Sequence, residues 1–161
     1  MPSKEQLAIY LNDHLAGSAA GRDLADKIAR KHEGRPAGPT LAQLAREISE
    51  DQEALAELMR RLEIGQSRIK VAAGSLAERA SRLVFELGVE GDSDLNQFLE
   101  LESLLLGVNG KRALWQALRA VAATRSDWPG VDLDRLLARA DSQIQRLSRL
   151  HLEAAVASLG G

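Results

Sequence analysis

The chain has 161 residues, of which 45% are hydrophobic and 27% charged, and these values are typical of a folded domain rather than a disordered or fibrous chain. It contains no cysteine, which excludes disulfides, thiolate nucleophiles and cysteine-ligated metal centres. The 21 basic and 23 acidic residues give a net charge of −2 and are interleaved, which argues against a nucleic-acid-binding surface.

The amino terminus lacks the basic segment and apolar run of a secretory signal, and no stretch approaches the roughly 18–20 apolar residues of a membrane span. Leu and Ala dominate, aromatic residues make up only 3%, and no segment alternates with the period of a strand. We therefore expect an all-α, single-domain cytoplasmic protein over residues 1–161, with no membrane span.

The first predicted helix covers residues 4–33 and ends at the run of glycines and prolines over residues 34–39. The middle of its apolar stripe is small, with Gly17, Ser18, Ala20 and Gly21. A glycine destabilises a helix interior by about 1 kcal/mol relative to alanine. This pattern predicts that another helix, or a ligand, approaches closely at this level.

The second predicted helix begins at Thr40, which forms a capping box with Gln43, and continues to about residue 63. Its core-facing stripe contains one carboxylate, Asp51, and Glu47 lies one turn earlier on the same side. A third helix is expected over residues 67–87, followed by a turn and a new helix N-cap at residues 91–94.

The fourth predicted helix, residues 94–124, is the most apolar part of the chain, yet it contains Glu102 and Lys111. The neighbours of both residues on a helix are almost all apolar, and a buried charge is costly unless it is paired. We expect Glu102 to pair with an arginine of a neighbouring helix and Lys111 to meet Asp13 or a helix C-terminus. Gly107 and Gly110 lie in the same helix.

A fifth helix is predicted from an Asp132 cap to about residue 159, with His151 in its apolar stripe. Short connections make successive helices antiparallel. Residues at the same height in the bundle should therefore lie equally far along the chain from the connection between their helices, and we place the centres of the connections near residues 36, 65, 90 and 127. We call this matching reflection about a connection. This reflection places Glu47, Asp51, Glu102 and His151 near one layer, and His14 with Lys111 in another. The predicted buried polar residues are Asp13, His14, Asp51, Glu102 and Lys111.

Two interpretations of these residues are open. Carboxylates and a histidine that converge between helices can hold two iron or manganese ions, and the candidate ligands here are Glu47, Asp51, Glu102 and His151. Alternatively, arginines neutralise the carboxylates in an ordinary polar layer. The Glu-x-x-His pairs that di-metal bundles place on two helices are absent, which favours a bundle with no metal and no other cofactor.

Three segments carry a resemblance to a known group: YLNDHLAGSAAGRDLA at residues 10–25, EISED at 47–51 and LELESLLLGVNGKRALW at 99–115. They are similar to small uncharacterised bacterial proteins of the ferritin-like four-helix-bundle type. The resemblance implies an antiparallel bundle of four long core helices, with residues 66–91 as a helical crossover.

The sequence assigns no catalytic residues, and three kinds of function stay open. The first is a metal-free structural or protein-interaction module whose partner is a second copy or another protein. The second is a ferritin-like di-metal carboxylate protein, an oxidase or a metal-handling protein, with a reduced ligand set. The third is binding of a small apolar or lipid-like molecule between helices near Gly17, Gly21 and Gly107.

Overall fold

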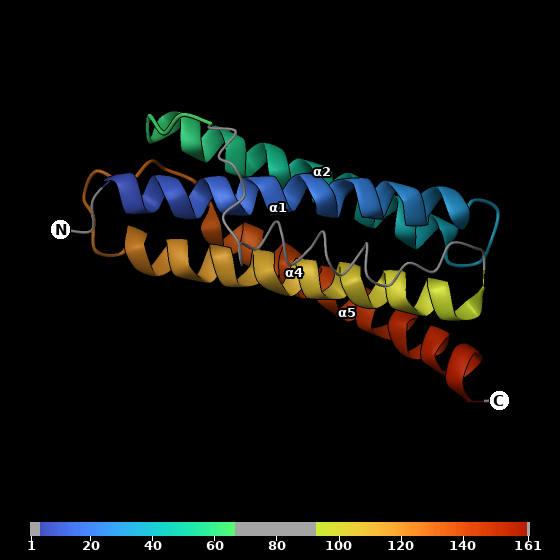
Figure 1. Ribbon diagram of the computed structural model, residues 1–161. Coiled ribbons are helices and arrows are strands. Elements are labelled where there is room, and N and C mark those ends of the chain that lie inside the picture. The colour runs from blue at the N-terminus through green and yellow to red at the C-terminus, as the bar shows by residue number, and fades with distance from the viewer. Residues whose placement is uncertain (1–3, 67–92, 161) are drawn as a thin grey trace.

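The computed structural model describes residues 4–66 and 93–160 (Figure 1). They form four α-helices: α1 (Lys4–Lys31), α2 (Gly38–Arg61), α4 (Asp94–Ala122) and α5 (Leu133–Leu159). These ranges confirm the all-α class and the four predicted helices, whose ends differ by about two residues. The predicted helix at 67–87, and with it the expected crossover, lies outside the described residues.

The four helices form two antiparallel pairs that lie against each other (Figure 1). Helix α1 contacts α2 and α4, while α5 contacts α4 extensively and α2 at fewer positions. The arrangement is a four-helix bundle. None of the helices in the described ranges has the length and apolar character that crossing a membrane requires.

Two of the predicted helix starts are confirmed by their capping bonds. The Ser93 hydroxyl accepts a hydrogen bond from the Asn96 amide at the start of α4, and Asp132 accepts one from the Arg135 amide at the start of α5. The capping box predicted at Thr40 is wrong. Helix α2 begins two residues earlier with a proline in its first turn, where the fixed φ of proline suits a helix start.

The connection between α1 and α2 depends on two glycines. Gly34 has a φ of +75°, a conformation that is strained for other residues. A Cβ on Gly38 would lie 2.4 Å from the His32 carbonyl oxygen, so the backbone can approach this closely only without a side chain. The tight connection fixes α1 and α2 as antiparallel neighbours.

The hydrophobic core has two parts, one toward each end of the bundle. The first includes Leu11, Leu55, Leu114 and Ala140, and the second includes Leu24, Ile48, Val108 and Leu147. Along each helix the two parts are separated by a short interval. The residues in that interval are polar or small: Gly17, Ser18 and Gly21 on α1, Asp51 on α2, Lys111 on α4 and Gln143 on α5.

Candidate functional site

An ion pair between α2 and α4 lies at the centre of this interval. The Asp51 carboxylate is 2% exposed and accepts hydrogen bonds from the Lys111 ammonium, from Gln143 Nε2 at 3.0 Å and from Arg139 Nε at 2.8 Å. The Lys111 ammonium also donates to the Gln143 side-chain oxygen. Both oxygens of Asp51 are therefore bonded, and three helices are joined at one point.

A second set of ionic contacts surrounds this pair. Glu47 lies one turn before Asp51 and accepts hydrogen bonds from Arg146 at 3.3 Å and from Gln143 at 3.3 Å. The guanidinium of Arg139 also donates to Glu50 at 2.8 Å. The network contains three carboxylates and three cations, so its net charge is zero. Its members are Glu47, Glu50, Asp51, Lys111, Arg139 and Arg146.

Burial changes the proton affinity of two groups in the network. It lowers the pKa of the Lys111 ammonium, and the Asp51 carboxylate opposes that change. For Glu47, burial raises the pKa, but hydrogen bonds from Arg146, Gln43 and Gln143 outweigh it, so the pKa is lowered below its ordinary value of 4.5.

The shift at Glu47 predicts how stability depends on acid. Because its pKa is lower in the folded state, the stabilisation is present above about pH 4.5 and is lost as the pH falls through the folded-state pKa. Glu47→Gln is therefore expected to reduce the loss of stability on acidification, measured by urea unfolding from pH 6 to pH 3. Glu53→Gln, at an exposed position of the same helix, is the control, and equal acid profiles for the two variants would contradict the prediction.

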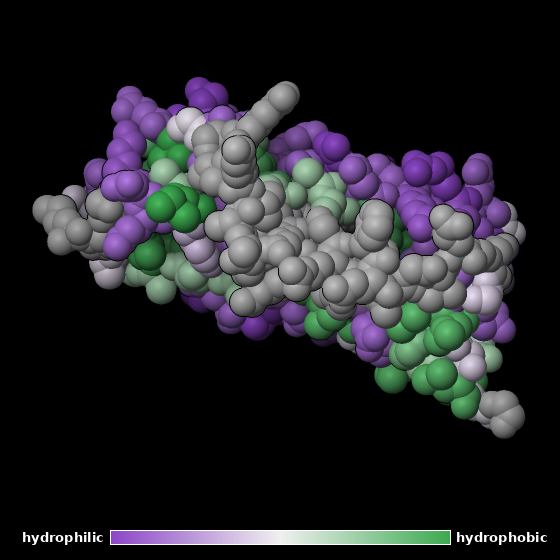
Figure 2. Space-filling view, in the orientation of Figure 1, coloured by the Kyte–Doolittle hydropathy of each residue, from purple (hydrophilic) through white to green (hydrophobic). Residues whose placement is uncertain are grey.

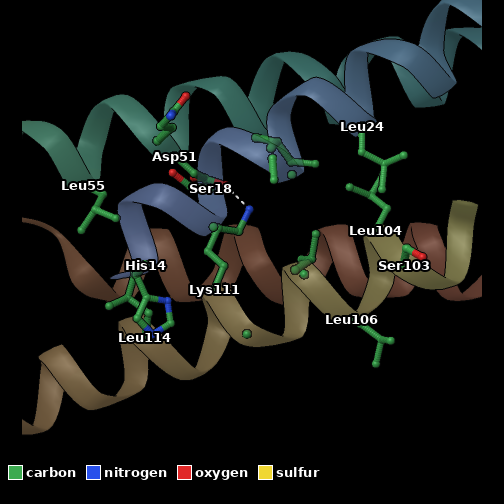
Figure 3. Close-up of a pocket in the computed structure, with 18 of the residues that line it drawn as sticks. His14, Ser18, Leu24, Asp51, Leu55, Ser103, Leu104, Leu106, Lys111 and Leu114 are labelled. Carbon is green, nitrogen blue, oxygen red and sulfur yellow. Dashed lines mark hydrogen bonds and ion pairs between the residues drawn. The ribbon is translucent and has the colours of Figure 1, made fainter. Parts of the chain in front are cut away.

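A cavity of about 280 Å³ lies beside the network, between α1, α2 and α4. Figure 3 shows Lys111 and Asp51 near its middle, His14, Leu55 and Leu114 toward one end, and Leu24 and Leu104 toward the other. Most of the lining is apolar. It includes Gly17, Ser18 and Gly21 of α1, Ile48 of α2, and Val108, Gly110 and Trp115 of α4.

Three of the four glycines that line the cavity do not bring helices into close contact. At Gly21, Gly107 and Gly110, a Cβ would meet no other heavy atom within 4 Å in the described part of the chain. The close approach of another helix, one of the two explanations predicted for the small stripe of α1, is therefore wrong at Gly21. Gly21 of α1 and Gly107 and Gly110 of α4 therefore face open space in the described part of the chain.

Few polar atoms of the lining are available to a bound molecule. Ser18 and Ser103 donate their hydroxyl hydrogens to carbonyls of their own helices. His14 packs edge-on against Tyr10, and burial lowers its pKa, with Asp13 opposing, so the imidazole is uncharged at neutral pH. The Trp115 indole is 1% exposed, and its N–H has no hydrogen-bond acceptor among the described residues.

The structure separates the residues that the sequence placed in one layer. Glu102 is half exposed, and its described partner is His151, at 3.4 Å from Nε2 to Oε1, rather than the arginine that was predicted. Lys111 meets Asp51 and Gln143, so the predicted contact with Asp13 or a helix C-terminus is also wrong. Asp13 itself is partly buried on α1.

The four proposed metal ligands do not form a metal site. Glu47 is bonded to Arg146, Asp51 to Lys111 and Arg139, and Glu102 faces His151. Within residues 4–66 and 93–160, no three His, Asp or Glu residues gather closely enough to hold a metal ion. This arrangement does not fit a di-metal centre.

Sequence reasoning missed Gln143 and Arg139, although one signal was present for Gln143. It lies three residues after Ala140 and four before Leu147, both of which are core residues, so helical spacing places it on the buried face of α5. It is completely buried. Arg139 gives no comparable signal, because long side chains reach a buried carboxylate from many positions at the edge of a helix face.

Comparison of the chain with protein-family models, curated proteins and solved structures finds no match among them.

Proposed function

We propose that the protein binds a small, largely apolar molecule in the cavity between α1, α2 and α4, and that it does so without a metal ion. The observation that carries this proposal is the set of glycines in the cavity wall. Gly21 of α1 and Gly107 and Gly110 of α4 line the cavity, and no packing contact in the described structure requires them.

These glycines are costly for the fold. Each destabilises its helix by about 1 kcal/mol relative to alanine, in a class of molecules whose total stability is about 5–15 kcal/mol. A Cβ at any of the three positions would touch nothing within 4 Å among the described residues. Alanine would therefore fit, and larger side chains would occupy the space that a ligand needs.

The lining of the cavity is a second supporting feature. Most of it is apolar, and the ion pair of Lys111 and Asp51 lies near its middle (Figure 3). An apolar pocket with a small number of polar groups is the usual form of a small-molecule site.

The charged network supports the site as a framework. Its carboxylates are bonded to cations of α4 and α5, so it joins α2 to those helices beside the cavity. The α2 and α4 walls are thereby joined to each other, and the described members of the network bond to one another without a ligand.

The protein-interaction module predicted from the sequence has one observation in its favour. Leu152, Val156 and Leu159 are 63%, 74% and 65% exposed on the last turns of α5, where Figure 2 shows hydrophobic surface. Their spacing of four and three residues places them on one helix face. The cavity supports ligand binding more strongly, because the glycines and the apolar lining are two features at one place.

The proposal is tested by filling the cavity. Gly110→Leu is expected to abolish the binding of butylbenzene, measured by isothermal titration calorimetry, while it preserves or raises the melting temperature, because leucine is the better helix former. Ala117→Leu makes a similar addition on the exposed side of the same helix and is the matched control. It should bind butylbenzene as the wild type does.

Either of two results would refute the proposal. One is that the folded wild-type protein does not bind butylbenzene or any compound of similar size. The other is that Gly110→Leu folds and still binds butylbenzene with unchanged affinity, which would place the binding elsewhere. Gly21→Leu, on the opposite wall, repeats the test from α1.

A further inference from the structure

We infer that the protein pairs with a second copy of itself through the last turns of α5, in an antiparallel arrangement with two-fold symmetry. The contact surface consists of the exposed residues Leu152, Val156 and Leu159, and we call it the α5 stripe. This inference is independent of ligand binding, because no described residue of α5 lines the cavity.

The last turns of α5 take little part in the core of the bundle. Leu147 and Leu150 are buried, whereas none of residues 151–159 is buried, although His151 and Ala154 still contact the rest of the bundle. Figure 1 shows α5 diverging from the other helices toward its C-terminal end. Helices in proteins are stabilised mainly by packing of an apolar face, and a short isolated helix is marginal in water. The α5 stripe is an apolar face that the described residues do not cover.

The α5 stripe is complementary to itself. Its residues are four and three apart, which is the spacing that lets two helices interlock along one face. If two copies are antiparallel with Val156 at the symmetry axis, the two Val156 side chains meet, and Leu152 of one copy meets Leu159 of the other. Such a pair uses the same patch on both subunits and therefore stops at two copies.

Charge complementarity also favours a second copy as the partner. Among the described helices, α1, α2 and α4 have basic residues in their last turns, where they stabilise the negative end of the helix dipole, whereas α5 has none. Arg149 lies one turn before Leu152 on the same face, is exposed, and forms no ion pair with the described residues. In the antiparallel pair, Arg149 of each copy lies within reach of the C-terminal end of α5 in the other. Each copy thus supplies the cation that the other helix end lacks.

The size of the α5 stripe sets the strength of the pair. Three large apolar residues from each copy make a smaller contact than the roughly 800 Å² per partner of a standard interface. We therefore expect a dimer that exchanges with the monomer and whose population depends on protein concentration.

Analytical ultracentrifugation of the full chain, from about 5 µM to about 500 µM, tests for a weak interface of this size. The wild type is expected to shift from monomer to dimer as the concentration rises. Val156→Glu places two carboxylates against each other at the symmetry axis and should weaken the dimer at least about tenfold. Arg149→Glu should weaken it about threefold to tenfold, because it places an anion at the negative end of a helix. Both positions are exposed, so both variants are expected to fold.

Two exposed positions outside the α5 stripe provide matched controls. Ile9→Glu introduces the same charge at an apolar residue of α1 that is 56% exposed. Arg135→Glu makes the same charge reversal at an exposed position near the other end of α5. Neither variant should change the dissociation constant of the dimer.

Disulfide cross-linking tests the orientation of the two copies, because the chain contains no cysteine of its own. In the antiparallel pair, Val156→Cys should form a disulfide-linked dimer under mild oxidation, since two cysteines can be bridged when their Cα atoms lie within about 7 Å. Leu152→Cys alone should not, but an equal mixture of Leu152→Cys and Leu159→Cys should form the mixed dimer. Ala157→Cys, which is exposed on another side of α5, is the control for random collision.

Any of three results would overturn the inference. One is a wild-type protein that stays monomeric up to about 500 µM, which would leave the α5 stripe to a different protein or to no partner. Another is a dimer that Val156→Glu does not weaken, which would place the contact elsewhere. The third is efficient cross-linking of Leu152→Cys with itself, which would indicate a parallel pair.

Discussion

Asp51→Leu is expected to lower the free energy of unfolding by about 3–5 kcal/mol, because it removes the anion of a buried ion pair and leaves its cation in place. The Lys111 side chain is only 14% exposed and would keep Gln143 as its one described acceptor. Arg139 would keep its contact with Glu50. Urea unfolding at pH 7 measures the loss.

The same variant should become less unstable, relative to the wild type, as the pH rises. Without Asp51, burial lowers the pKa of Lys111 further. The folded variant then loses the Lys111 proton at a lower pH than the folded wild type does, while the unfolded state still holds it. Stability therefore rises as the pH increases from 7 toward about 10, the ordinary pKa of lysine. A destabilisation that stays constant over this range would show that the buried ammonium is not its cause.

Two further variants control this prediction. The double variant Asp51→Leu/Lys111→Met removes both charges and should recover much of the lost stability, since apolar residues can replace a buried pair. Asp141→Leu breaks the exposed pair with Arg112 and should cost no more than about 1 kcal/mol. If the double variant is as unstable as Asp51→Leu alone, the ion pair does not explain the loss.

Leu55→Ala is expected to cost about 3–5 kcal/mol, near the upper end for buried leucines. Leu55 is 2% exposed and lines the cavity, so its removal enlarges an existing space that the surrounding helices have already failed to close. Thermal and urea unfolding measure the loss. The enlarged cavity should also accept a longer ligand than butylbenzene, so hexylbenzene is expected to bind this variant more tightly than the wild type.

Leu44→Ala is the control for this second effect. Leu44 is completely buried in the other part of the core and does not line the cavity. Its replacement should also destabilise the protein by about 2–5 kcal/mol, without any change in the preferred length of the ligand. An equal change in ligand length for both variants would mean that general loosening, rather than local volume, determines the fit.

The sequence predicted the helices well because their signals are local. Apolar spacing fixed four helices to within a few residues, and Ser93 and Asp132 marked two of the starts correctly. The same spacing showed that Asp51 and Lys111 must face the core. Each of these inferences depends only on residues within one or two turns of a helix.

The partners of the buried charges were not predictable in the same way. Reflection about the connection near residue 127 places residue 111 opposite residue 143, and Lys111 does contact Gln143. The reflection fails for the connection that contains residues 67–92. It placed Asp51 level with Glu102, whereas Asp51 contacts Lys111, nine residues further along the chain. A short connection fixes the relative level of two helices, whereas a long one does not.

The cavity also could not be derived from the pattern alone. The small residues on α1 and α4 indicated that another helix or a ligand lies close to them. Two helices with glycines, however, can either pack closely or stay apart. The outcome depends on the packing of the flanking side chains, such as Leu114 and Trp115, which are buried beside the cavity. Such distances come from packing in three dimensions, which periodicity does not encode.

The position of the cavity also bears on how a ligand would reach it. Leu106 and Gly107 line the cavity and are exposed, so the space opens to the surface along α4. A small molecule can therefore enter from solvent without local unfolding of a helix. The rate of its exchange is then expected to depend on diffusion and desolvation rather than on opening of the bundle.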